Sequence, residues 1–60
     1  MARVLVVDDS ELVRVSLQKD LQDRQVDTVT APDGLRALDV MRETPELELV
    51  IADYTMPGMD

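Results

Sequence analysis

Two stretches of the sequence decide the fold: RVLVVDD at residues 3–9 and LELVIAD at residues 47–53. Each contains a run of apolar residues that predicts a short strand buried on both faces, and each run ends in aspartate. In parallel α/β sheets the carboxyl ends of the strands form the ligand-binding edge. Asp8, Asp9 and Asp53 would repel one another there unless a cation lay between them. A hard divalent cation with oxygen ligands is the simplest solution.

The segments between these stretches alternate between helical and extended patterns. Ser10 can cap a helix that continues without Gly or Pro, and a Pro-Asp-Gly turn at residues 32–34 introduces a second helix. This alternation predicts an α/β fold with a parallel sheet and right-handed crossovers. The predicted strands are residues 3–7, 26–31 and 47–52, and the predicted helices are residues 11–24 and 35–43.

The first predicted helix carries an apolar stripe. Val13, Leu17 and Leu21 lie four residues apart, so we expect this face to pack against the sheet. Leu12 and Val15 lie off the stripe. They are either simply exposed or part of a contact surface, and the sequence leaves both alternatives open.

The composition of the 60 residues limits the possible functions. A net charge of −7 argues against nucleic-acid binding, which needs clusters of Lys and Arg. No apolar stretch approaches the roughly 20 residues of a membrane span, and the N-terminus lacks a signal-peptide pattern. With no cysteine to form disulfides, a cytoplasmic protein without membrane contact is expected. The chain also has no histidine to act as metal ligand, base or phosphoryl carrier.

Nucleotide-binding folds with the same α/β layout fail at the turn after the first strand. A dinucleotide-binding fold needs a glycine-rich turn and a P-loop needs GxxxxGK[ST], whereas Asp8-Asp9-Ser10 would repel phosphate. A Mg²⁺-dependent phosphatase with an aspartate nucleophile would need Asp-x-Asp. Helix capping by Asp8 or Asp9, and a turn role for Asp53, are the purely structural alternatives. Matching positions on strands about 4.8 Å apart favour a shared cation instead.

Three motifs together resemble one family. VLVVDDS at residues 4–10, TAPDG at residues 30–34 and LVIADYTMPGMD at residues 49–60 are similar to the receiver domain of two-component response regulators. The resemblance implies a flavodoxin-like parallel sheet with helices on both faces and strand order 2-1-3-4-5. Residues 1–60 would form its N-terminal half, a partial fold of strand, helix, strand, helix and strand.

The resemblance also implies roles for individual residues. Asp53 matches the phosphorylated aspartate of the family. Asp8 and Asp9 match the acidic pair that holds Mg²⁺, Asp9 more directly and Asp8 through water. Thr55 matches the position whose backbone carbonyl joins the metal ligands. The implied metal site therefore comprises Asp8, Asp9, Asp53 and Thr55.

The resemblance implies protein partners as well. An intact receiver catalyses its own Mg²⁺-dependent phosphorylation, taking the group from a sensor histidine kinase or a histidine phosphotransfer protein. Leu12 and Val15 would lie near the docking face. The Ser/Thr and Lys that contact the phosphoryl group would follow residue 60, so we expect impaired phosphotransfer. The alternative is a self-associating half-fold without phosphotransfer, and the exposed third strand favours a homodimer.

Overall fold

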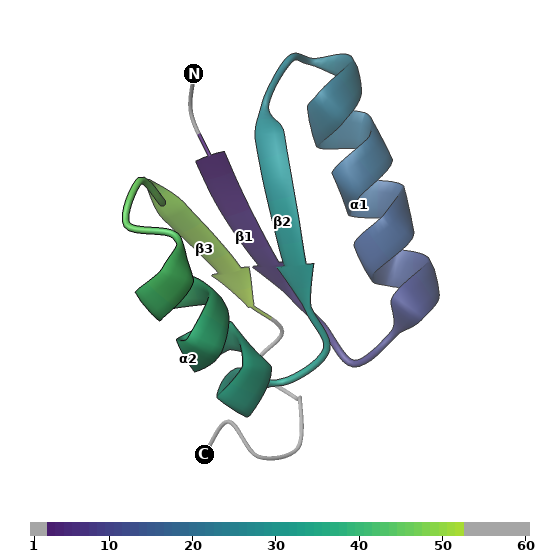
Figure 1. Ribbon diagram of the computed structural model, residues 1–60. Helices are drawn as coiled ribbons and strands as arrows, with labels where there is room; N and C mark the ends of the chain where they lie inside the picture. Colours follow the sequence, from purple (N-terminus) through teal and green to yellow (C-terminus); the bar gives the residue numbers. More distant parts are fainter. Residues whose placement is uncertain (1–2, 53–60) are drawn as a thin grey trace.

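The computed structural model describes residues 3–52 of the 60-residue chain (Figure 1). The alternation of strands and helices expected from the sequence is confirmed. The largest boundary difference is in the third strand, which begins at Leu49 rather than at residue 47, because a turn bond joins the Leu47 N–H to the Thr44 carbonyl. The elements are β1 (Arg3–Val7), α1 (Glu11–Asp23), β2 (Asp27–Ala31), α2 (Gly34–Glu43) and β3 (Leu49–Ala52).

The three strands form one parallel sheet in the order β2-β1-β3. At its carboxyl edge Val7 of β1 pairs with Ala31 on one side and with Ala52 on the other. The chain steps from β1 to β2 in one direction and from β2 to β3 in the other. Right-handed crossovers therefore place α1 and α2 on opposite faces of the sheet (Figure 1). This arrangement is that of a partial flavodoxin-like fold.

The core is centred on β1, whose last four residues are all buried. Leu5 and Val7 pack with Ala31 of β2 and with Ala37 of α2. Because side chains alternate along a strand, the other buried residues of β1 point to the face that α1 covers. Neither of the helices that the structure describes is long and apolar enough to cross a membrane.

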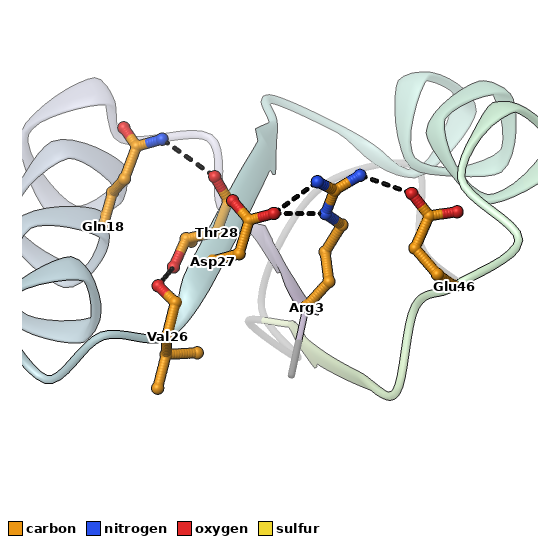
Figure 2. A network of polar contacts seen from close by, with 6 residues as sticks. All are labelled: Arg3, Gln18, Val26, Asp27, Thr28 and Glu46. Carbon is orange, nitrogen blue, oxygen red and sulfur yellow. Dashed lines mark hydrogen bonds and ion pairs between the residues drawn. The ribbon is translucent and has the colours of Figure 1, made fainter. Parts of the chain in front are cut away.

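The face of α1 that packs on the sheet differs from the predicted stripe. Leu17 and Leu21 are half-buried as expected, but Val13 is 40% exposed and the half-buried neighbour Arg14 takes its place. The reason is hydrogen bonding. Arg14 and Gln18 both donate from this face to backbone carbonyls, of the loop after β1 and of β2 respectively. Figure 2 shows the Gln18 amide directed at the Thr28 carbonyl.

Arg3 connects the amino-terminal ends of the strands. Its Nε donates to Asp27 Oδ2 at 2.6 Å, its Nη2 pairs with the same oxygen, and its Nη1 donates to Glu46 Oε1 at 2.5 Å (Figure 2). Asp27 begins β2, and Glu46 lies in the turn before β3. One guanidinium therefore joins the starts of all three strands, at the edge of the sheet opposite to the predicted site.

Candidate functional site

The candidate site lies at the carboxyl edge of the sheet, where β1 and β3 end side by side. Val7, the residue before Asp8, pairs with Ala52, the residue before Asp53. The strands that carry the two predicted acidic positions are therefore neighbours, as the sequence predicts. Asp53 and Thr55 themselves lie outside the described residues, so their roles stay predictions.

Asp8 is held at all three of its polar groups. Its N–H donates to the Ala31 carbonyl at 3.2 Å, and its own carbonyl accepts from Arg14 Nη1 at 2.6 Å. Its side-chain Oδ1 accepts from the Ser10 N–H at 2.9 Å. These bonds tie the first residue after β1 to β2, to α1 and to the start of the loop. They fix Oδ1, while Oδ2 accepts no hydrogen bond from residues 3–52.

Ser10, rather than either aspartate, caps α1. Ser10 has extended backbone angles, and its Oγ accepts from the Val13 N–H at 3.3 Å. The capping alternative is therefore wrong for Asp8 and Asp9. Asp9 is exposed, and within the described part of the chain no group donates a hydrogen bond to its carboxylate. Asp33 presents the contrasting case, because its Oδ1 caps α2 by accepting from the Arg36 N–H at 2.8 Å.

Comparison with known proteins identifies the family to which the chain belongs. Residues 4–60 match the family described as the response regulator receiver domain. The chain belongs to this family. The resemblance carried by the three sequence motifs is thereby confirmed, and the chain is a receiver domain of two-component signalling.

Three curated relatives illustrate the range of proteins that contain such a domain. The sporulation initiation phosphotransferase F of Bacillus subtilis is 37% identical over 59 residues, which are 97% of this chain and 46% of the relative. A protein-glutamate methylesterase/protein-glutamine glutaminase of Halobacterium salinarum is 41% identical over 61 residues, covering 100% of this chain and 17% of the relative. The sensor kinase CckA of Brucella abortus is 38% identical over 60 residues, covering 98% of this chain and 6% of the relative. The chain thus spans less than half the length of each of these relatives.

The described half of the receiver site fits a hard cation in its chemistry. Asp8 and Asp9 offer carboxylate oxygens, the ligands that Mg²⁺ prefers. Asp8 is already oriented by its hydrogen bonds, and Asp9 has a carboxylate open to solvent. Residues 3–52 do not by themselves contain three acidic, His or Cys side chains placed to hold a metal ion. The predicted set is completed only by Asp53 and Thr55.

Arg14 is a residue beside this site that the sequence pattern does not reveal. It lies in the second turn of α1, half-buried, with its guanidinium on the Asp8 carbonyl. It places a positive charge beside the acidic loop, which is formed by Asp8, Asp9 and Ser10. The sequence feature that could have indicated Arg14 is its position next to Val13, where a charged residue adjoins the apolar stripe. Periodicity alone, however, assigns such a residue to solvent.

Proposed function

We propose that this receiver domain accepts a phosphoryl group on Asp53 in a Mg²⁺-dependent reaction. The observation that carries the proposal is the register of β1 and β3, which pairs Val7 with Ala52 and so ends both strands at one edge. The orientation of Asp8 and the exposure of Asp9 support it. The membership of the chain in the receiver family supports the same chemistry.

In the proposed step, a carboxylate oxygen of Asp53 attacks the phosphorus of an activated donor. A new P–O bond forms as the bond to the leaving group breaks, and the leaving group keeps that electron pair. Asp8, Asp9 and Asp53 would hold Mg²⁺ together with the backbone carbonyl of Thr55. Bound Mg²⁺ supplies positive charge that offsets the repulsion between a carboxylate and a phosphoryl group. The hydrogen bonds of Asp8 fix part of this arrangement in advance, which lowers the cost of assembling it.

The donor in this proposal lies outside these 60 residues, because they contain no histidine, and a small activated phosphodonor such as acetyl phosphate can take its place. A histidine kinase or a histidine phosphotransfer protein fits, and one of the relatives is named a sensor kinase. Leu12 and Val15, which are 77% and 54% exposed on α1, offer an apolar docking surface beside the acidic loop. A cytoplasmic location and the absence of nucleic-acid contact remain predictions from the sequence.

Phosphorylation by acetyl phosphate tests the proposal. With Mg²⁺ present, intact mass measurement of the 60-residue chain should show Asp53-dependent phosphate that hydroxylamine removes, as expected for an acyl phosphate. The labelled fraction should be well below that of the sporulation phosphotransferase, an intact relative. Asp53→Asn should abolish the label, whereas Asp20→Asn, which removes an exposed carboxylate of α1, should keep it.

Each remaining result of this experiment contradicts part of the proposal. Label that persists in Asp53→Asn would exclude Asp53 as the acceptor. Stoichiometric label in the unmodified chain would show that phosphotransfer is not impaired. Complete absence of label would favour the alternative of a half-fold without phosphotransfer.

Mg²⁺ binding is tested separately from phosphate transfer. Tyr54, the only aromatic residue, follows Asp53 in the sequence and provides a fluorescence signal for a Mg²⁺ titration. A weak, saturable change is expected, since Mg²⁺ keeps several waters in such sites. Asp9→Asn should weaken the affinity by about tenfold or more, because it removes a charged ligand. Asp20→Asn changes the net charge equally and should leave the affinity nearly unchanged, so an equal effect of both variants would refute the site.

A second proposal concerns self-association, and the exposure of β3 favours it. We propose that two copies of the 60-residue chain pair through this strand. Among the described residues β3 forms one edge of the sheet, with Leu49, Val50 and Ile51 exposed. A shallow hollow of about 420 Å³ adjoins it on the α2 side, with Met41 and Leu47 in its lining. An exposed apolar edge strand is a template for pairing with another chain.

A further inference from the structure

We infer that the guanidinium of Arg14 positions the Asp8–Asp9 peptide group and thereby sets the affinity of the acidic loop for its cation. The positioning of the peptide group rests on the geometry of α1. The effect on cation affinity rests on the proposed function. The observation that carries it is the bond of 2.6 Å from Arg14 Nη1 to the Asp8 carbonyl oxygen, made by a half-buried side chain.

The planarity of the peptide bond extends this contact to Asp9. The carbonyl of Asp8 and the N–H and Cα of Asp9 belong to one rigid plane, so a donor that fixes the oxygen also restricts the orientation of Asp9. Asp9 needs such a constraint, because its exposed carboxylate has no hydrogen-bond partner among residues 3–52. Arg14 therefore restricts the orientation of Asp9 indirectly, whereas Ser10 and Ala31 restrict that of Asp8 by direct hydrogen bonds.

Arg14 is itself well anchored for this task. Its N–H donates to the Ser10 carbonyl at 3.0 Å, so its backbone belongs to the first bonded turn of α1. A guanidinium is planar and presents its N–H donors in a fixed fork, whereas the ammonium of lysine is a compact, strongly hydrated charge on a flexible stem. The bond joins a charged donor to a neutral carbonyl, which makes it stronger than a neutral pair.

The hydrogen bond of Arg14 should raise the affinity for the cation, whereas its positive charge should lower it. The charge reduces repulsion between the carboxylates when the loop is empty and repels a divalent cation when the loop is occupied. At 1 M salt the Debye length is about 3 Å, so this charge effect is reduced, whereas the hydrogen-bond geometry is not screened. Salt concentration therefore separates the two contributions. At high salt, loss of the guanidinium should only weaken binding.

The test uses three variants of the 60-residue chain. Arg14→Met removes the guanidinium and keeps an unbranched stem, and Arg14→Lys keeps the positive charge. Gln18→Met is the matched control. Gln18 lies one turn later on the same face of α1 and also donates to a backbone carbonyl, that of Thr28 at 3.2 Å, but away from the acidic loop. If Arg14 only attached α1 to the sheet, Arg14→Met and Gln18→Met would behave alike.

The first measurement is the NMR signal of the Asp9 amide in the metal-free chain. A hydrogen bond to the Asp8 carbonyl polarises the peptide group that contains this amide, so Arg14→Met should shift and broaden the signal while Gln18→Met leaves it in place. The second measurement is the Mg²⁺ titration at 1 M salt. Arg14→Met should weaken the affinity about tenfold, Arg14→Lys several-fold, and Gln18→Met by less than twofold.

The outcomes distinguish this inference from the proposed function. If the unmodified chain binds no Mg²⁺, the metal-dependent part of the proposed function is wrong. The Asp9 signal of the metal-free variants would still decide whether Arg14 positions the loop. An unchanged Asp9 signal in Arg14→Met would overturn the inference. So would a Gln18→Met variant that matches it in both measurements. Should Arg14→Met fail to fold, an Arg14→Lys variant with the Asp9 signal and the Mg²⁺ affinity of the unmodified chain would overturn the need for a guanidinium.

Discussion

The 60-residue chain is expected to sediment as a homodimer at high concentration and to dissociate on dilution. Leu49, Val50 and Ile51 are 55%, 40% and 37% exposed at the edge of the described sheet. Burying the exposed parts of these side chains in two copies would contribute on the order of 6 kcal/mol. The open edge of β3 also presents a row of backbone groups that a second copy can pair with, so we expect a weak, concentration-dependent dimer.

A charge in the proposed contact should remove this dimer. Leu49→Lys is expected to shift the population toward unfolded monomer, visible in sedimentation and in far-UV circular dichroism. Leu12→Lys is the matched control, because Leu12 is 77% exposed on α1 and lies away from β3. The control variant should keep the dimer. A folded monomer of the unmodified chain at every concentration would contradict the contact.

Leu5→Ala is expected to cause the largest loss of stability of any single truncation. Leu5 is fully buried in the central strand, where it packs with Val7 and Ala37. Such a truncation costs about 2–5 kcal/mol. A core of this size supplies only about 3–5 kcal/mol of stability, so most of the variant should be unfolded at 25 °C.

Urea unfolding followed by circular dichroism measures this effect. Leu12→Ala removes the same atoms from an exposed position and should change the free energy of unfolding by less than about 0.5 kcal/mol. Similar transitions for Leu5→Ala and Leu12→Ala would show that β1 is not the centre of the core.

The fold was predictable where a simple pattern had one structural meaning. The continuous apolar run of β1 indicated a strand buried on both faces, and Leu5 and Val7 are buried as expected. The sequence predicts the third strand two residues too early because Leu47 is apolar and adjoins the run of residues 49–52, whereas a turn bond occupies the Leu47 N–H. Periodicity does not register such local bonds.

Hydrogen bonds that the sequence pattern does not register also determine the packed face of α1 and the geometry of the candidate site. Val13 was assigned to the sheet because it is apolar, yet Arg14 and Gln18 face the sheet through bonds to backbone carbonyls. Strand-end position was sufficient to select Asp8 and Asp9. It could not show that Asp8 is fixed by three hydrogen bonds, because two of their partner groups belong to β2 and α1.

The hydrogen bond from Gln18 to the Thr28 carbonyl makes the two edges of the described sheet unequal as sites for pairing with another copy. It occupies a backbone acceptor on β2, while β3 at the other edge keeps exposed apolar side chains. A chain with two open edges could add copies without limit and form a fibre. With one edge obstructed, pairing of β3 with β3 uses the same surface on both copies and closes on itself. Substitution of Gln18 would free this acceptor and leave β2 more open to pairing with another copy.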